Sequence, residues 1–133
     1  MLVEILRPDQ QVLMTEVDSC SLPGDEGYLT ILPGHTKMVS RLGVGVIQLK
    51  GEKEEQFFFV SGGYVEVDQK SVVILGDVIE NSHDIDEERA RRSIQKAEHQ
   101  LRGSETVDVE RVNKAIARAE ARLECRRLYS SLS

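Results

Sequence analysis

Short hydrophobic segments separated by turn-forming residues fill the first 84 residues of the chain. β-Branched and aromatic residues dominate the segments, and Gly, Pro and Asp lie between them. A series of this kind, with turn signals about every 8–12 residues, is typical of a β-sandwich or a flattened barrel. We predict strands at 3–6, 11–17, 28–32, 45–49, 56–60, 64–67 and 72–75, with turns at 7–9, 23–25, 33–34, 50–52 and 68–70.

The spacing of apolar residues becomes helical after residue 84. Steps of four, three and four place Ala90, Ile94, Ala97 and Leu101 on one face of a first helix, and Val112, Ile116, Ala119 and Leu123 on one face of a second. The first helix is expected to stop at Gly103-Ser104, and the second to run from Asp108 towards Tyr129. Only a short loop is left between the two helices, and two helices joined by a short loop form an antiparallel hairpin.

These patterns predict an α+β chain with two parts. Residues 1–84 form a mainly β domain, and residues 85–133 form the helical hairpin. Three of the eight residues on the helical contact faces are alanine, which buries little apolar area, and each Å² buried contributes only about 25 cal/mol. Two interpretations stay open, namely a weakly docked hairpin that moves and a hairpin that is permanently packed.

Size and charge narrow the class of protein. The 133 residues are 40% hydrophobic and 30% charged, and no apolar run approaches the roughly 18 residues that cross a bilayer. The first ten residues, MLVEILRPDQ, lack the basic start and apolar core of a signal peptide. Membrane association is therefore expected to be indirect.

The charge is distributed unevenly along the chain. Residues 1–84 hold 6 Lys+Arg against 14 Asp+Glu, a net −8, whereas residues 85–133 hold 11 against 9, a net +2. Such asymmetry indicates two surfaces with different partners. A pI near 5.1 argues against nucleic acid as a partner.

The two cysteines carry no recognisable motif. Cys20 and Cys125 lie far apart, with no C-x-x-C pair or Cys/His cluster, so we expect neither a metal site nor a disulfide framework. Both are interpreted as reduced thiols in a cytosolic compartment.

Residues 61–64, Ser-Gly-Gly-Tyr, fall between two predicted strands. The paired glycines predict a turn or bulge with positive φ. The segment is not a phosphate-binding P-loop, because it lacks the Lys-Ser/Thr pair and the following helix of that motif. His35 could combine with Asp25 and Ser61 in a hydrolase triad, but no nucleophile-elbow motif accompanies them. A small hydrolase is therefore disfavoured.

A basic stripe follows the second predicted helix. Its members, spaced three, four, four and four residues apart, are Arg111, Lys114, Arg118, Arg122 and Arg126. Cations on one face repel one another unless an acidic surface or a polyphosphate lies close. The alternative is a solvated face partly neutralised by glutamates of the same helix, Glu110, Glu120 and Glu124.

The segment Ile85–Ala90 also has two interpretations. Asp86 is expected to cap the first helix, with Glu87 and Glu88 placed favourably against the helix dipole. The functional alternative requires Arg89 to point towards a ligand.

Four motifs, taken in their order along the chain, carry a family resemblance. They are GYLTILPGH at 27–35, SGGYVEV at 61–67, VVILGD at 72–77 and IDEERA at 85–90. In this order and spacing they resemble the epsilon subunit of bacterial F-type ATP synthases, and the match covers essentially the whole chain. The resemblance implies a β-sandwich of about ten strands, followed by a helical hairpin, in a subunit that performs no catalysis.

The resemblance also implies partners and a place in the cell. The sandwich would bind the gamma subunit and the c-ring in the central stalk, on the cytoplasmic face of the inner (plasma) membrane, and would couple proton-driven rotation to ATP synthesis. The c-ring contact maps onto one loop with Glu26, Tyr28 and His35. Tyr28 stands where the family usually has an acid, and Thr36-Lys37-Met38 replaces its common Ala-Pro-Leu.

Family members that bind ATP share an Ile/Leu-Asp-x-x-Arg-Ala motif, an upstream glutamate and two helix arginines. The matching residues here are Glu80, Ile85, Asp86, Arg89, Ala90, Arg118 and Arg122. ATP, as a regulatory ligand and not a required cofactor, would fold the hairpin against the sandwich. Without it, the hairpin would extend towards the alpha and beta subunits and inhibit hydrolysis, with contacts through Arg111, Arg118, Arg122 and Arg126. A free-standing ATP-sensing module is the alternative.

Overall fold

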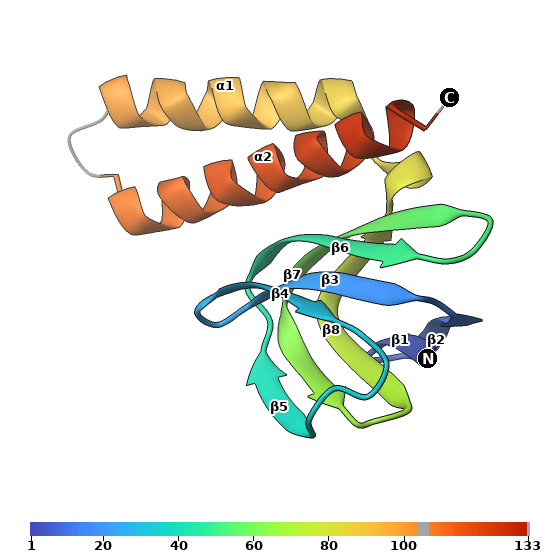
Figure 1. The fold of residues 1–133 in the computed structure, drawn as a ribbon. Coiled ribbons are helices and arrows are strands. Elements are labelled where there is room, and N and C mark those ends of the chain that lie inside the picture. The colour runs from blue at the N-terminus through green and yellow to red at the C-terminus, as the bar shows by residue number, and fades with distance from the viewer. Residues whose placement is uncertain (104–106, 133) are drawn as a thin grey trace.

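The computed structural model describes residues 1–103 and 107–132, which form a folded β-sheet with a helical hairpin above it (Figure 1). The strands are β1 (Leu2–Arg7), β2 (Gln10–Glu16), β3 (Ser19–Gly24), β4 (Gly27–Ile31), β5 (Met38–Arg41), β6 (Val44–Lys50), β7 (Glu55–Val67) and β8 (Ser71–Asn81). A 3₁₀ turn, η1 (Ser82–Asp84), then leads into α1 (Glu87–Gly103) and α2 (Val109–Ser130). The predicted fold class is confirmed, with eight strands in the described residues where the resemblance implied about ten.

The strands form one open sheet that folds over on itself. Its order is β2-β1-β8-β7-β6-β3-β4, with β5 pairing β7 beside this path. β1 and β8 pair in parallel, and the other pairs are antiparallel. The enclosed core includes Val3, Ile5, Leu22, Ile31, Ile47, Phe58, Val60, Val65 and Ile74.

β7 replaces two predicted strands because the glycine pair bends it without ending it. Gly62 and Gly63 have φ of 77° and 123°, as the prediction of positive φ required. Pairing with β8 continues on both sides of the bend, from Ser61 opposite Val78 to Gly63 opposite Gly76. A Cβ at Gly63 would collide with the carbonyl oxygen of Leu75, so only glycine fits here.

Two strands were not predicted from the sequence. β3 contains Pro23 and Gly24, for which the sequence predicts a turn. In the structure these residues instead continue the ladder, opposite Tyr28 and Gly27 on β4. β5 has only four residues, and its pairing partner is the distant end of β7. Neither strand carries a long hydrophobic run of its own.

Both helices begin at aspartate caps. The Asp86 side chain accepts a hydrogen bond from the Arg89 backbone N–H at 3.0 Å, which confirms the predicted cap of α1. Asp108 accepts one from the Arg111 N–H at 3.1 Å. α1 ends at Gly103, whereas Ser104, the other half of the predicted stop, lies outside the described residues.

α2 attaches the hairpin to the sheet through a second apolar cluster. Val46, Phe57 and Phe59 on the outer faces of β6 and β7 pack with Ile85 and Cys125. α1 lies on α2 (Figure 1). None of the described helices has the length and apolar character that a membrane-spanning helix needs.

Candidate functional site

A pocket of about 230 Å³ opens where the sheet meets the hairpin. Its walls come from the end of β8, from η1 and the segment that leads into α1, from the start of α1 and from the middle of α2. The lining residues are Glu80, Asp84, Ile85, Asp86, Arg89, Ala90, Ser93, Ala119 and Arg122. We call it the junction pocket. Six of the seven residues predicted for nucleotide binding line it, although they come from elements far apart in the sequence.

The seventh predicted residue, Arg118, lies outside the junction pocket. It lines a neighbouring cavity between α1 and α2. One helical turn separates it from Arg122, which displaces its side chain by about 6 Å along the helix axis. The sequence motif therefore placed two arginines in one site that the structure divides between two.

An ion pair crosses the junction pocket from the sheet to the hairpin. The Arg122 guanidinium donates to both carboxylate oxygens of Glu80, at 2.8 and 3.2 Å. The same guanidinium lies 4.4 Å from the centre of the Phe59 ring, a cation–π distance. Among the ion pairs of the described residues, it alone joins the hairpin to the sheet.

The next turn of α2 adds two contacts. Nη1 of Arg126 donates to the carbonyl oxygens of Ser82 and His83, at 3.3 and 3.1 Å. Cys125 is fully buried against β6 and β7. Burial, together with the nearby carboxylates of Glu80 and Glu124, raises the pKa of its thiol from 9.0 to about 12. The thiol is therefore protonated and shielded while α2 lies on the sheet.

Arg89 is the exposed cation of the junction pocket. Its backbone is fixed by the Asp86 cap, and its guanidinium has no ion-pair partner in residues 1–103 and 107–132. Ser93, one turn further along α1, donates to the Arg89 carbonyl at 3.0 Å. Asp86 uses one carboxylate oxygen as the cap, so its second oxygen remains for a ligand.

The residues predicted to contact a c-ring do not share one loop. Glu26 lies in the turn before β4, Tyr28 lies on β4, and His35 follows β4 at its far end. Tyr28 is 61% exposed, but its hydroxyl accepts a hydrogen bond from the Val46 N–H at 2.9 Å. The tyrosine therefore satisfies a backbone donor of β6.

Sequence reasoning missed the aromatic residues on which the hairpin packs beside the site. Phe57 and Phe59 face the hairpin, while Phe58 and Val60 between and beside them face the core. A strand buried on both faces reads as a continuous apolar run. The signal was therefore present in Phe57–Val60, and it predicts that something covers the outer face of β7.

Comparison with known proteins identifies the class. Two family models cover the chain, "ATP synthase, Delta/Epsilon chain, beta-sandwich domain" over residues 1–82 and "ATP synthase, Delta/Epsilon chain, long alpha-helix domain" over residues 83–125. The chain therefore belongs to the delta/epsilon chain family of ATP synthases. As a member, it is an accessory subunit and not a catalytic one.

The similar proteins agree with that assignment. The "ATP synthase epsilon chain" of Herminiimonas arsenicoxydans is 35% identical over 108 residues, which is 80% of this chain and 77% of the relative. That of Moorella thermoacetica is 40% identical over 101 residues, or 75% of each. A chain in the Euglena gracilis mitochondrial ATP synthase structure has the same fold, with a TM-score of 0.80 at 21% identity, covering 98% of this chain and 80% of that one.

Proposed function

We propose that this chain is a central-stalk subunit whose hairpin binds ATP when folded and inhibits ATP hydrolysis when extended. The observation that carries the proposal is the junction pocket. Its walls belong to β8, α1 and α2 together, so the complete pocket exists only while the hairpin lies on the sheet. A ligand that fits this pocket favours the folded state by its differential affinity alone.

The charges of the junction pocket support an anionic ligand. Arg89 and Arg122 both present guanidinium groups, which bind phosphate through paired hydrogen bonds. Glu80 already neutralises Arg122, so a phosphate there must share or displace the carboxylate. We therefore expect Arg89, with no such competitor, to contribute most of the phosphate affinity.

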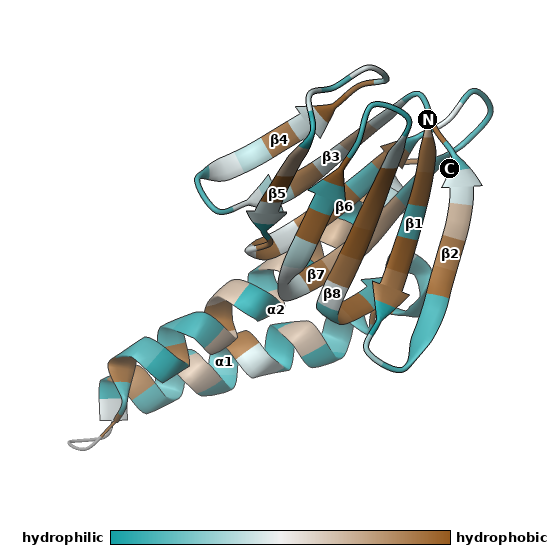
Figure 2. Cartoon of the chain, turned by 90° about the horizontal axis from the view of Figure 1, so that it is seen from below, coloured by the Kyte–Doolittle hydropathy of each residue, from teal (hydrophilic) through white to brown (hydrophobic). Residues whose placement is uncertain are grey.

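The outer face of the sheet supports docking to a partner. Tyr64 lies opposite Leu75 on β8 and Arg41 on β5, and Val39 shares their face two residues from Arg41. Val39, Tyr64 and Leu75 are 72%, 51% and 47% exposed. Figure 2 shows where β5, β7 and β8 lie in the sheet, with each residue coloured by its hydropathy. A patch of exposed apolar residues on one sheet face is typical of an interaction surface, and we assign it to the gamma subunit.

The remaining contacts follow from the same two-state scheme. Glu26 and His35 would meet the c-ring, which would hold the chain at the cytoplasmic face of the inner membrane. In the extended state Arg122 loses its partner on β8 and Arg126 loses its partners on η1. With Arg111 and Arg118, these arginines become available to acidic residues of the alpha and beta subunits. A tenfold change in the ratio of the two states needs a differential affinity of about 1.4 kcal/mol.

Calorimetric titration of the full chain with ATP tests the nucleotide site. We expect saturable binding that Arg89→Ala weakens strongly, whereas Arg92→Ala, an exposed cation on the same helix that lines none of the junction pocket, leaves it unchanged. If no binding is seen at millimolar ATP, the motif at Ile85–Ala90 serves only as a helix cap.

Inhibition is tested in the intact complex. Removal of residues 85–133 from this chain should raise ATP hydrolysis by the complex if the hairpin inhibits it. An unchanged hydrolysis rate in a complex that still contains the truncated chain would contradict an inhibitory role.

A further inference from the structure

A gap between two strands lies beside the surface on which the hairpin docks. The ladder between β3 and β6 ends at the pair Ser21–Gln48. The two segments meet again where the Gly43 N–H donates to the Pro23 carbonyl oxygen at 3.0 Å. Val46 lies on β6 between these two points, so its backbone N–H needs an acceptor that the ladder does not supply.

Tyr28 supplies that acceptor from the neighbouring strand β4. Its hydroxyl oxygen accepts a hydrogen bond from the Val46 N–H at 2.9 Å. Gly45 makes room for the hydroxyl, because a Cβ at this position would collide with the Tyr28 oxygen and would lie 3.1 Å from the Pro23 side chain. A tyrosine on β4 and a glycine on β6 therefore act together to satisfy the Val46 amide.

Val46 also belongs to the surface that carries the hairpin. Its side chain packs with Phe59 of β7 and Cys125 of α2 in the second apolar cluster. Only 5% of the Val46 residue is exposed while α2 is docked. The docked helix therefore keeps water away from the amide of Val46 as well as from its side chain.

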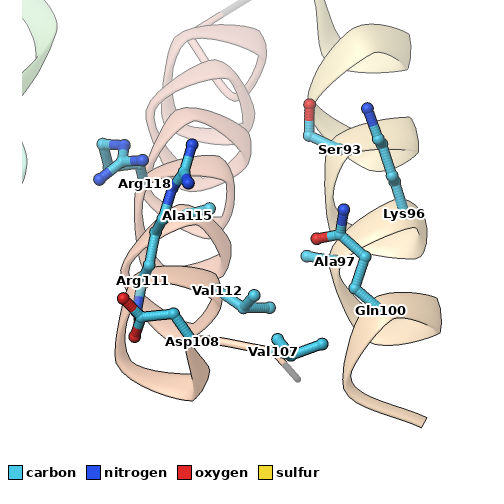
Figure 3. Close-up of a pocket in the computed structure, with 10 residues that line it drawn as sticks. All are labelled: Ser93, Lys96, Ala97, Gln100, Val107, Asp108, Arg111, Val112, Ala115 and Arg118. Atoms are coloured by element: carbon cyan, nitrogen blue, oxygen red, sulfur yellow. The ribbon is translucent and has the colours of Figure 1, made fainter. Parts of the chain in front are cut away.

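The apolar contact between α2 and the sheet is short. The α2 residues of the cluster come from the C-terminal half of the helix, namely Ala121, Cys125 and Leu128. In the N-terminal half, Val112 and Ala115 line the cavity between α1 and α2 instead (Figure 3). A small change beneath the C-terminal half of α2 is therefore expected to alter how firmly the hairpin docks.

We propose that the Tyr28 hydroxyl is a positioning group that favours the docked hairpin over the open one. Without this hydroxyl, the Val46 N–H would be a buried donor with no partner while α2 covers it, and such a donor is costly. Once the hairpin opens, water can bind the N–H in place of the hydroxyl. The hydrogen bond therefore stabilises the docked state more than the open state, and Tyr28 acts on the hairpin through Val46.

The inference rests on the proposed function in one respect, namely that the hairpin opens as a unit. It adds a position outside the hairpin that controls the opening. The Tyr28 ring is 61% exposed, so a partner that draws its hydroxyl away from Val46 would favour the open state. Gly45→Ala imitates that event within the chain, because the added Cβ takes the place of the hydroxyl.

Thiol labelling of Cys125 in the full chain tests the proposal, because the buried thiol meets a reagent only after the hairpin opens. We expect Tyr28→Phe and Gly45→Ala each to speed the labelling about fivefold. The double variant should be about as fast as either single one, because both substitutions remove the same hydrogen bond. Thr30→Val removes an exposed hydroxyl from the same face of β4 and should change the rate by less than about twofold.

A purely structural role of the hydrogen bond predicts a different pattern. If the bond only stabilised the sheet, the docked and open states would lose it alike. Tyr28→Phe would then speed the labelling of Cys20, which needs unfolding of the sheet core, and would leave the labelling of Cys125 unchanged. That pattern would overturn the inference, and so would additive effects of Tyr28→Phe and Gly45→Ala in the double variant.

Glu80→Gln separates failure of the inference from failure of the proposed function, because it removes the ion pair between the sheet and α2. If Glu80→Gln speeds Cys125 labelling and Tyr28→Phe does not, the hairpin opens as proposed and only the inference is wrong. If Cys125 and Cys20 of the unaltered chain are labelled equally slowly, with the same steep urea dependence, the hairpin does not open on its own. In that case the inference and the two-state hairpin both fail.

Discussion

Replacement of Glu80 by Gln should loosen the hairpin from the sheet. The substitution keeps the shape of the side chain but removes the charge that pairs with Arg122 at 2.8 and 3.2 Å. Phe59 still faces the guanidinium at 4.4 Å, so part of the environment of Arg122 survives. The loss is therefore confined to one ionic contact across the junction.

The degree of burial sets the expected magnitude. The side chains of Arg122 and Glu80 are 30% and 36% exposed. Fully exposed pairs contribute about 0–1 kcal/mol, and breaking a fully buried pair costs about 3–5 kcal/mol. A pair that is one-third exposed lies between these limits, and we expect about 1–2 kcal/mol. That free energy raises the population of the open hairpin about 5- to 30-fold.

Thiol labelling of Cys125 measures that population. The thiol is buried under α2 with its pKa raised to about 12, so a thiol reagent reacts with it only after opening. Peptide mass spectrometry separates it from Cys20, whose labelling requires unfolding of the sheet core. A shallow urea dependence of Cys125 labelling, beside a steep one for Cys20, identifies local opening.

Glu124→Gln is the matched control. Glu124 also lies near Cys125 and raises its pKa, but its ion pair is with Arg127 on the exposed face of α2. We expect Glu124→Gln to change the labelling rate by less than about twofold. An equal rate in Glu80→Gln and the unaltered chain would refute the assignment of the Glu80–Arg122 pair as a contact that holds the hairpin down.

Three further predictions concern single positions. Arg126→Gln removes two charge-assisted bonds to backbone carbonyls and should speed Cys125 labelling about fivefold, a loss of about 1 kcal/mol. Gly63→Ala places a Cβ against the Leu75 carbonyl at a φ of 123° and should lower the unfolding free energy by at least about 2 kcal/mol, measured by urea unfolding. Burial raises the pKa of the Cys20 thiol from 9.0 to about 12, so the unfolded chain releases this proton at a lower pH than the folded chain does. The unfolding free energy therefore keeps the full contribution of the buried thiol below pH 9 and loses it as the pH rises towards 12. Between about pH 8 and pH 10 the unfolding free energy of Cys20→Ala should therefore fall about 1 kcal/mol less than that of the unaltered chain, and an equal fall would contradict the assignment.

Local sequence signals predicted the elements that depend on local chemistry. The alternation of apolar residues located most strands, the 4-3-4 spacing located both helices, and Asp86 and the Gly62-Gly63 pair adopt the predicted cap and positive φ. These features are set by backbone geometry within a few residues. Pairing between distant segments leaves no such local signal, which is why β3 and the short β5 were missed.

The same distinction between local features and contacts of distant segments applies to the candidate site. The motif around Ile85–Ala90 grouped residues that lie together in the junction pocket, and their role in nucleotide binding stays a prediction. The motif gave no indication that Arg122 pairs with Glu80, 42 positions away. It also grouped Arg118 with Arg122, although one helical turn separates their surroundings. Contacts between the hairpin and the sheet depend on how whole elements pack, and the spacing within one helix cannot specify that.

The central claim is that ATP holds the hairpin on the sheet, and Cys125 labelling in the presence of ATP tests it most directly. If ATP binds only the folded hairpin, it slows labelling by a factor that rises with its concentration relative to the dissociation constant. We expect this protection in the unaltered chain and its loss in Arg89→Ala. A labelling rate that does not change at ATP concentrations that saturate the calorimetric signal would contradict the claim.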